Sequence, residues 1–363
     1  MTASVFPTTQ RSPIDLNAQV LGDVRNHVGY LTLNRPEGIN AITLEMVRAL
    51  QGYLDAWAAD PHINAVVLRG AGERGFCAGG DIRSLHDSYK AGNDLHRDFF
   101  REEYALDLCL HQYRKPVVAL MDGFTLGGGM GLAQGAELRV VTEHSRLGMP
   151  ETAIGYFPDV GASYFLSRLP GELGIYLGVT GVKIEAADAL YCGLADWFVS
   201  RDKLALFEER LDKLAWSDNP LKDLQSVLAK LGVQALPDAP LNRLRPAIDH
   251  FFALPDIASM VEQLHQVTVA DSHAWAEHTI SLMRSRSPLA MGVTLELLRR
   301  GRALNLEGCF ALETALGSQW FEHGDLIEGI RALLIDKDKT PRWNPPTLEQ
   351  LAPRRVEQFF EGL

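Results

Sequence analysis

The segment MPETAIGYFPDVGASYFL, residues 149–166, places two carboxylates, Glu151 and Asp159, among apolar, glycine and proline residues. A solvated loop would carry more polar residues, and a core element does not normally carry two acids. Such a pattern suggests a site at which a carboxylate does chemistry. Taken alone, Glu151 could instead stabilise the start of a helix, and Asp159 could cap a turn through Gly161. The wider sequence has to decide between these interpretations.

Composition limits the classes of partner. The 363 residues include 46 acidic and 35 basic side chains, which gives a formal net charge of −11, and 46% are hydrophobic. This is enough apolar material for a large core and more than one structural unit. An acidic chain without a dense basic run argues against nucleic acid and anionic membrane surfaces. No apolar run reaches the ~20 residues needed to span a bilayer, so we expect no membrane partner.

The four cysteines are scattered and form no CxxC pair, so neither a zinc site nor a disulfide framework is predicted. A reducing cytoplasm fits this pattern. Residues 1–17 lack the apolar core of a secretory signal and are predicted to be a flexible tail. The HAWAEH run at residues 273–278 has the wrong spacing for a zinc-protease helix and is interpreted as an exposed helical face. No metal site is therefore expected.

Strands and helices alternate over residues 18–200, which is typical of an α/β domain. Two short strands are joined by a tight turn at Asn26 and His27, and Thr43 is a suitable N-cap for an amphipathic helix. Buried strands are predicted in NAVVLRG, KPVVALMDG and LRVVTE, with a helix at about residues 95–113. Residues 201–363 are expected to be mostly helical and to include an insertion at about residues 216–250.

Two glycine-rich loops follow predicted strands. FCAGGDI, residues 76–82, lets backbone N–H groups approach a ligand, and Asp81 would cap the next helix. In GFTLGGGMG, residues 123–131, three glycines open a helix whose unpaired N–H groups favour an anion. The spacing matches neither a P-loop nor GxGxxG, so a developing oxyanion is preferred over a phosphate. An ordinary strand-to-helix turn remains the alternative for the first loop.

Four motifs in the same order, NRPEGINAI, FCAGGDI, GFTLGGGMGL and MPETAIGYFPDVGASYFL, resemble the crotonase, or enoyl-CoA hydratase/isomerase, superfamily over about residues 20–199. The resemblance implies an α/β fold, a crotonase-like spiral of ββα units with a helical C-terminal region. It implies an acyl-CoA thioester substrate and no separate cofactor, since coenzyme A is part of the substrate. By position, the oxyanion donors would be Gly80 and Gly128. Coenzyme A would bind near Ala78, Gly79 and Asp81.

The resemblance also narrows the reaction. Hydratases of this superfamily carry a catalytic glutamate three residues after the second oxyanion glycine, where this chain has Gly131. They usually have glycine where this chain has Asp159. The REEY run at residues 101–104, the 149–161 block and the C-terminal LIEGIRALLIDKDKTPRW are similar to 3-hydroxyisobutyryl-CoA hydrolases of valine breakdown. This similarity implies thioester hydrolysis, and the glycine at 131 is expected to leave room for a branched, hydroxylated acyl group.

Each acid then has an expected role. Glu151 would activate water or attack the thioester directly, and the sequence leaves both routes open. Asp159 would orient Glu151 or the water, or hold the substrate's hydroxyl. By resemblance, Glu103 would line the acyl pocket; its alternative is a solvated helical acid paired with Arg101 or a neighbouring residue. Cys77 has no nearby histidine or metal pattern and is interpreted as small buried filler.

Two other functions remain open. One is a hydratase or isomerase on the same fold, for which the glycine at position 131 is the discriminating feature. The other is a non-catalytic acyl-CoA binder, against which the two retained acids argue, because a binder has no need of buried carboxylates. A homo-oligomer is also expected. The superfamily often forms trimers through its helical C-terminal part, but the longer tail here leaves dimer and trimer both open.

Overall fold

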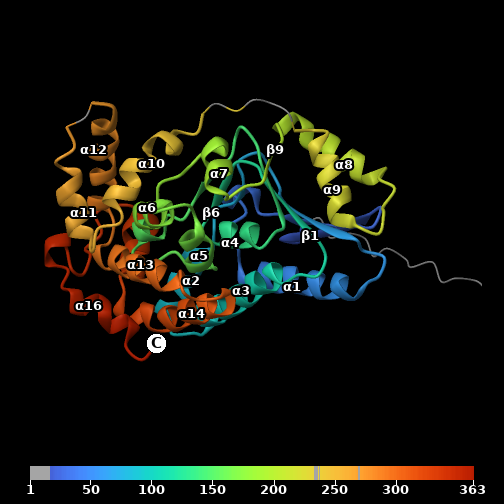
Figure 1. Cartoon of the computed structure of the whole chain (residues 1–363). Coiled ribbons are helices and arrows are strands. Elements are labelled where there is room, and N and C mark those ends of the chain that lie inside the picture. The colour runs from blue at the N-terminus through green and yellow to red at the C-terminus, as the bar shows by residue number, and fades with distance from the viewer. Residues whose placement is uncertain (1–16, 233–235, 237, 269) are drawn as a thin grey trace, which may run out of the picture.

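The computed structural model of the chain describes residues 17–232, 236, 238–268 and 270–363. Two sheets lie at the centre, and helices surround them (Figure 1). Apart from Asn17, the predicted N-terminal tail falls outside the described residues. Within the described part of the chain, no helix is long and apolar enough to cross a membrane.

The larger sheet has six strands in the order β1-β2-β3-β5-β7-β9. The first pair is the predicted antiparallel hairpin, and Asn26 and His27 at its turn have φ values of 40° and 67°, as a two-residue hairpin loop requires. All other neighbours in this sheet run parallel. The strands are β1 Val20–Arg25, β2 Val28–Leu33, β3 Ala65–Gly70, β5 Val117–Met121, β7 Leu138–Val141 and β9 Trp197–Phe198.

A second, parallel sheet has three short strands, β4 Gly75–Cys77, β6 Phe124–Leu126 and β8 Arg146–Gly148. In chain order, each of β3, β5 and β7 in the large sheet is followed by one strand of the small sheet and then by a helical segment. This repeat is the ββα spiral that the resemblance implied, and the expected α/β class is confirmed. The residue pattern itself did not reveal β4, β6 or β8, because three residues are too few to show an alternation.

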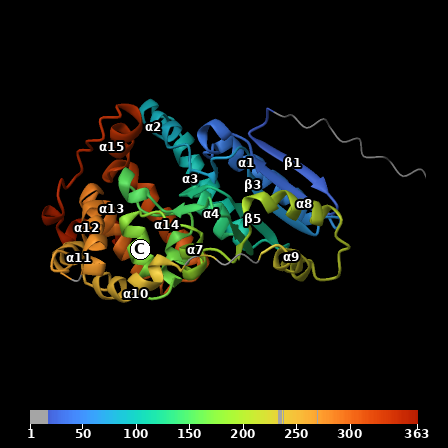
Figure 2. The same ribbon diagram turned by 90° about the horizontal axis from the view of Figure 1, so that it is seen from above.

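The large sheet is covered on both faces. Side chains alternate along its strands, so that Leu31 and Val66 join the core under α1 (Leu44–Ala59), whereas Tyr30 and Val67 face the other way. This outer face packs against α8 (Leu204–Asp212) and α9 (Pro220–Ala229), which lie beside the strands and away from the later helices (Figure 2). The region predicted to be helical from residue 201 therefore begins with two α-helices that pack against the large sheet.

The predicted helix starts in the core are confirmed. Thr43 Oγ1 accepts a 3.2 Å hydrogen bond from Met46 N at the start of α1. Asp81 caps α2 (Ile82–Ala91) by accepting from Ser84 N at 3.4 Å. The next helix, α3 (Leu95–His111), ends two residues before the predicted position. These caps place the starts of α1 and α2 next to the glycine loops.

Helices α13 (Pro288–Gly301), α14 (Leu306–His323) and α15 (Leu326–Ile330) contribute to a separate core cluster around the Glu151–Asp159 segment, whereas the helices at residues 240–285 pack on the main core. Tyr156 and Phe157 pack among buried side chains of α13 and α14, and the Trp320 indole donates a 2.8 Å hydrogen bond to Gly155 O. The helical C-terminal region thus closes over the segment that carries the two acids. Its helices are α10 Pro240–Phe251, α11 Ile257–Leu264, α12 Ala270–Ser285, α13 Pro288–Gly301, α14 Leu306–His323, α15 Leu326–Ile330 and α16 Pro353–Glu357; the core adds α4 Gly128–Gln134, α5 Ala162–Phe165, α6 Leu173–Thr180 and α7 Ala186–Cys192.

The predicted insertion at about residues 216–250 contains α9 and most of α10, which pack against different parts of the molecule. Residues 233–235 and 237 within it lie outside the described residues. Its status as an insertion, and the division at residue 200, stay predictions.

Candidate active site

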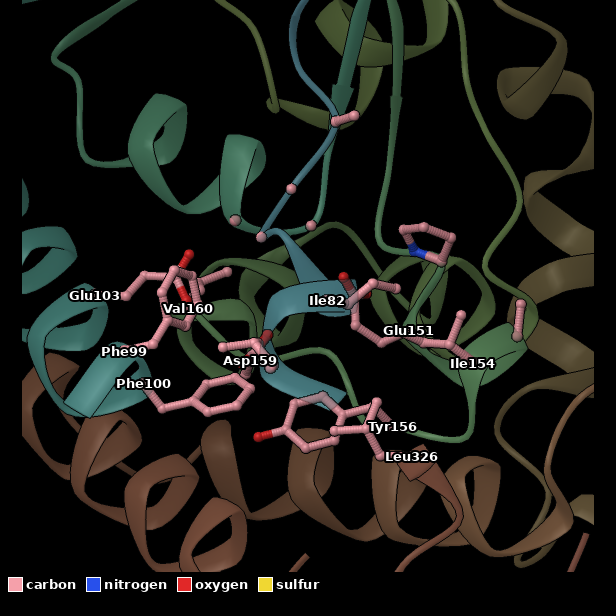
Figure 3. A pocket seen from close by; sticks show the side chains of 18 residues that line it. Ile82, Phe99, Phe100, Glu103, Glu151, Ile154, Tyr156, Asp159, Val160 and Leu326 are labelled. Atoms are coloured by element: carbon pink, nitrogen blue, oxygen red, sulfur yellow. The ribbon is translucent and has the colours of Figure 1, made fainter. Parts of the chain in front are cut away.

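All of the predicted site residues except Asp81 line one cavity of about 180 Å³ (Figure 3). Three carboxyl groups reach it from different elements, and in Figure 3 Asp159 lies between Glu103 on one side and Glu151 on the other. The rest of the wall is largely apolar. Its main apolar side chains are Ile82, Leu85, Phe99, Phe100, Ile154 and Leu326.

The small sheet explains why these segments meet. Ala78 and Gly79 follow β4, Gly127 follows β6, and Glu151 comes shortly after β8. Because the three strands are parallel neighbours, their carboxyl ends lie at one edge of the sheet. The carboxyl edge of a parallel sheet is a common place for a ligand. The three short strands, which the residue pattern did not predict, therefore bring the segments of the site together.

The two glycine loops touch each other. A Cβ added to Gly79 would lie 3.5 Å from Gly128 N, and Gly79 and Gly127 have φ values of 100° and 51°, which glycine tolerates and other residues rarely adopt. Within the described chain, the N–H groups of Gly80 and Gly128 donate to no protein acceptor. Two neighbouring unpaired N–H groups have the chemistry of an oxyanion hole, so the predicted role of these glycines is compatible with their surroundings.

The glycines of the second loop also make space for acids. A Cβ on Gly127 would lie 2.7 Å from Glu151 Oε1, and a Cβ on Gly128 would lie 2.5 Å from Glu103 Oε1. A side chain at either position would have to displace a carboxyl group. The loop therefore fixes both the backbone donors and the places of two carboxylates.

Glu151 begins the 3-10 turn Glu151–Ile154 directly after Pro150, and its side chain is 7% exposed. Its Oε2 has no hydrogen-bond partner among the described residues. The turn itself is held from outside, since Thr152 Oγ1 donates to Val179 O at 3.1 Å. A buried carboxylate oxygen that faces a cavity without a partner is available for chemistry.

Asp159 does not act as a cap for the turn through Gly161. Its backbone carbonyl closes that turn by accepting from Ala162 N at 2.8 Å, while its carboxylate Oδ2 accepts a 2.6 Å hydrogen bond from the Tyr104 hydroxyl. The side chain is 5% exposed and lines the cavity. The structural alternative for this acid is therefore wrong.

Glu103 is not a solvated helical acid either. It is 2% exposed, and Oε1 has no hydrogen-bond partner among the described residues. Arg101 points elsewhere and pairs with Asp98 at 2.7 Å. Glu103 lies on the face of α3 that lines the cavity, as the resemblance implied.

Burial raises the pKa of every acid in the site. Desolvation is the main cause for Glu103 and Glu151, whose pKa values lie well above the ordinary range, and nearby carboxylates add to the rise. Burial raises the pKa of Asp159 to about 7, although the hydrogen bond from Tyr104 opposes the rise. A carboxyl group with a raised pKa can exchange protons near neutral pH.

Asp81 and Cys77 differ from the other predicted or considered residues. Asp81 is absent from the cavity wall; its carboxylate caps α2 and forms a 3.1 Å ion pair with Arg35. A contact between Asp81 and coenzyme A therefore stays a prediction. Cys77 is fully buried, and burial raises the pKa of its thiol to about 12, which agrees with its interpretation as filler.

Sequence reasoning missed two further acids beside the cavity. Asp107 is fully buried, and neither carboxylate oxygen has a partner in the described chain. It follows Glu103 by four residues, so the helical spacing on α3 was a usable signal. Glu313, on α14, is also fully buried, and burial raises its pKa to about 8. No local signal pointed to Glu313, because its partners lie about 150 residues away in the chain.

A comparison with protein families decides the relationship. The family model described as enoyl-CoA hydratase/isomerase matches residues 28–360. The chain belongs to the enoyl-CoA hydratase/isomerase family. The resemblance predicted from four motifs is thereby confirmed, and the match extends beyond the motifs to nearly the whole chain.

Curated members of the family match over nearly their whole length. Proteins named 3-hydroxyisobutyryl-CoA hydrolase, mitochondrial, are 37% identical in Gallus gallus, 38% in Danio rerio and 36% in Homo sapiens. The matches cover 95–96% of this chain and 90% of each relative. The compartment in these names belongs to the relatives, and the cytoplasmic location expected for this chain stays a prediction.

Solved structures of family members confirm the fold but carry other names. One is described as a carnitinyl-CoA dehydratase from Mycobacterium thermoresistibile, with a TM-score of 0.87, 37% identity, and coverage of 96% of this chain and 97% of that chain. Another is described as an enoyl-CoA hydratase from Rhodobacter sphaeroides 2.4.1, with a TM-score of 0.84, 36% identity, and coverage of 94% and 96%. The family and an acyl-CoA substrate class are therefore shared, whereas the printed names differ in the reaction.

The surroundings of Gly131 correct one expectation. The glycine was expected to leave open space beside the acyl chain, but a Cβ there would lie 2.6 Å from Val160 Cβ and 2.9 Å from Asp107 Oδ2. Helix α4, which carries Gly131, packs on α3 and on the turn at Val160. The side chains of Asp107 and Val160 fill the space beside Gly131. Position 131 therefore offers no open space, and the cavity itself lies between Glu103 and Glu151.

Proposed function

We propose that this family member hydrolyses the thioester of a short, branched 3-hydroxyacyl-CoA, with 3-hydroxyisobutyryl-CoA as the first candidate. The observation that carries the proposal is the filled space at Gly131, because it excludes a second acid at the position that hydratases use. Glu151 is then the carboxylate nearest to the glycine at position 127. The names of the full-length relatives support the same substrate.

The reaction needs charge stabilisation at one oxygen. As the thioester carbonyl carbon is attacked, negative charge develops on its oxygen, and the N–H groups of Gly80 and Gly128 would donate to it. Such donors act most strongly where water is excluded, and the apolar cavity wall provides this condition. Both glycines are therefore proposed as part of the catalytic machinery.

Glu151 would start the reaction by one of two routes. As a base, it takes a proton from a water molecule whose oxygen attacks the thioester carbon; the C–S bond then breaks, and coenzyme A leaves as the thiolate and takes up a proton. As a nucleophile, its oxygen attacks directly, coenzyme A leaves as the thiolate, and water then hydrolyses the anhydride. Label in the Glu151 carboxylate after a single turnover in ¹⁸O-labelled water identifies the nucleophile route, because only attack of water on the glutamyl carbonyl of the anhydride places the label there.

The neighbouring acids would select and orient the acyl group. Asp159, fixed by the Tyr104 hydroxyl, is proposed to hold the substrate's 3-hydroxyl group or the attacking water. Glu103 is proposed to line the acyl pocket from the other side. Ala78, Gly79 and Asp81 are proposed to contact the coenzyme A part of the substrate.

Hydration of an enoyl-CoA is the second candidate, and two observations favour it. Solved family members of similar length are described as a dehydratase and a hydratase. In addition, Glu103 approaches the glycine loop at Gly128 and could act as a second acid opposite Glu151. A non-catalytic acyl-CoA binder is disfavoured. Burying a carboxylate without a partner costs free energy, and binding alone does not require such a group.

A parallel assay separates the candidates. The protein is incubated with 3-hydroxyisobutyryl-CoA, other short acyl-CoAs and crotonyl-CoA, while free thiol and enoyl absorbance are followed together. We expect thiol release from the 3-hydroxyacyl thioesters and little or no loss of enoyl absorbance. Faster hydration of crotonyl-CoA than hydrolysis of 3-hydroxyisobutyryl-CoA would show that the hydrolase assignment is wrong.

Two coarser properties are proposed with the function. The four free cysteines are compatible with a reducing compartment such as the cytoplasm. A homo-oligomer, either a dimer or a trimer, is proposed because members of the superfamily often form oligomers. Light scattering after size-exclusion chromatography measures the oligomeric state directly.

A further inference from the structure

Val160, in the cavity wall, has an unusual backbone conformation. Its φ is 53°, in the left-handed region that a β-branched residue rarely adopts, and the following Gly161 also has a positive φ of 86°. Such conformations persist only where the surrounding structure holds them, and they gather at functional sites. The strained residue directly follows Asp159, so whatever holds Val160 also determines where that acid lies.

The turn at Val160 positions two side chains, that of Val160 itself and that of Asp159. The Val160 side chain lines the cavity and covers Gly131, whereas Asp159 is directed to the Tyr104 hydroxyl. A change of φ at residue 160 would rotate the peptide planes on both sides. Asp159 and the cover over Gly131 therefore depend on one dihedral angle.

The carboxylate of Glu313 holds the far end of this turn. Its Oε2 accepts a 2.7 Å hydrogen bond from Gly161 N, and its Oε1 accepts from Ser163 N at 2.8 Å and from Ser163 Oγ at 2.5 Å. Glu313 is fully buried on α14, a helix that packs against both α3 and α5. The three hydrogen bonds that its carboxyl oxygens accept all come from Gly161 and Ser163.

We propose that Glu313 is a positioning residue for the reaction proposed above: its carboxylate holds Gly161 and Ser163 so that Val160 stays in the left-handed conformation and Asp159 stays at the cavity. Both carboxyl oxygens suit this task, because each accepts a hydrogen bond from a backbone N–H group of the turn. The proposal rests on the proposed function for its catalytic readout. The claim that Glu313 keeps the turn at Val160 in place does not depend on which acyl-CoA reaction is catalysed.

The substitution Glu313→Gln tests the hold with little change in volume. Glutamine offers one acceptor oxygen, and its NH₂ group would face an N–H donor, so at least one bond to the turn is lost. Ser163→Ala is the matched control, since it removes only the hydroxyl bond and keeps both backbone donors. We expect Glu313→Gln to lower kcat/KM by about tenfold or more, because a misplacement of about 1 Å can cost about 10²-fold. Ser163→Ala should stay within about threefold of wild type.

Val160→Gly provides a rescue that a general packing defect would not show. Glycine adopts a positive φ without strain, so a turn with glycine at this position needs less support. In the Val160→Gly background, Glu313→Gln should cost less than about threefold in kcat/KM, and the double-mutant cycle should be non-additive. Equal losses in the two backgrounds, at temperatures where all four proteins are folded, would overturn the proposal.

Amide hydrogen exchange separates this proposal from the proposed function. The Gly161 and Ser163 amides should be protected in the wild-type protein and should exchange faster in Glu313→Gln, with Ser163→Ala close to wild type. If the wild-type protein releases no thiol from any acyl-CoA, the proposed function fails, while the exchange result still decides whether Glu313 holds the turn. Unchanged protection in Glu313→Gln would overturn the positioning role whatever the reaction is.

Discussion

The hydroxyl of Tyr104 donates a 2.6 Å hydrogen bond to Oδ2 of Asp159 and so connects helix α3 to the loop that enters the cavity. The Tyr156 hydroxyl lies 3.3 Å from that of Tyr104 and completes a short chain of buried polar groups that ends at Asp159. Because the bond stabilises the ionised carboxylate, it opposes the rise in the Asp159 pKa that burial causes. The balance of the two effects leaves that pKa near 7.

Removing the bond should move this balance. In Tyr104→Phe the pKa of Asp159 should rise further, since burial remains and the stabilising donor is lost. If the reaction uses the ionised form of Asp159, kcat/KM rises with pH through this pKa, and its midpoint should move to higher pH. The measurement is a pH profile of wild type, Tyr104→Phe and Tyr156→Phe, in which the last variant should shift less. Identical profiles for all three would show that the Asp159 charge does not control the rate.

Glu151→Gln should nearly abolish turnover and leave acyl-CoA affinity largely intact. The amide keeps the shape of the side chain but can act neither as a base nor as a nucleophile, which should cost at least about 10²-fold in kcat. Steady-state kinetics and acyl-CoA binding measure the two effects separately. Glu277→Gln, an exposed position on α12, is the control. More than a tenth of the wild-type kcat in Glu151→Gln would assign the chemistry to another residue.

The oxyanion donor at Gly128 can be tested by two substitutions that share one defect. Both Gly128→Ala and Gly128→Pro introduce a Cβ that would meet Glu103 Oε1 at 2.5 Å, but only proline removes the N–H group. The proline variant should therefore be slower than the alanine variant by a further ~10²–10³-fold in kcat. Circular dichroism and coenzyme A binding check that both remain folded. Equal rates in the two folded variants would contradict the placement of the donor.

Asp107 should make stability depend on pH in a particular direction. Burial raises the pKa of Asp107 well above its ordinary value of 3.8. The folded state then holds the proton more tightly than the unfolded state, so its contribution to the free energy of unfolding falls as pH rises above about 4. Asp107→Asn removes this titration and should gain stability relative to wild type progressively as pH rises above about 4. Urea unfolding at several pH values measures the difference, and a pH-independent difference would refute the predicted titration.

Gly131→Ala should destabilise the fold by overpacking. The new Cβ would meet Val160 and Asp107 inside 3 Å, and overpacking of a core typically costs about 1–3 kcal/mol. Gly52→Ala is a matched control, because a Cβ at that exposed position of α1 meets nothing within 4 Å. Alanine should stabilise the helix there by about 0.5–1 kcal/mol. Thermal unfolding of both variants measures the contrast, and a loss of the same size in both would argue against close packing at Gly131.

Local patterns were sufficient where a segment carries its own signal. The amphipathic spacing after Thr43 gave α1, the Asn26–His27 turn gave the hairpin, and the position of Asp81 gave the start of α2. Glu151 and Asp159 could be singled out because two acids in an apolar, glycine-rich segment are rare. In each case the decisive residues lie within a few positions of one another.

The rest depends on contacts between distant parts of the chain. Strand β8 forms by pairing with β6, which in turn pairs with β4, and nothing in three residues reveals this. Whether Glu103 is buried or solvated depends on the helices packed over α3, and Glu313 meets its partners only after α14 folds back. The room expected at Gly131 was wrong for the same reason, since Asp107 and Val160 reach it from separate elements.

The close packing around Gly131 also bears on how one activity in this family can evolve into another. A carboxylate gained at position 131 has no place until Asp107 and Val160 give way, and the turn at Val160 is itself fastened to α14. A single substitution of Gly131 by an acid would therefore disrupt the packing before the new carboxylate could take part in a reaction. A route from the proposed hydrolysis to hydration has to open space at position 107 or 160 first, and only then add the acid.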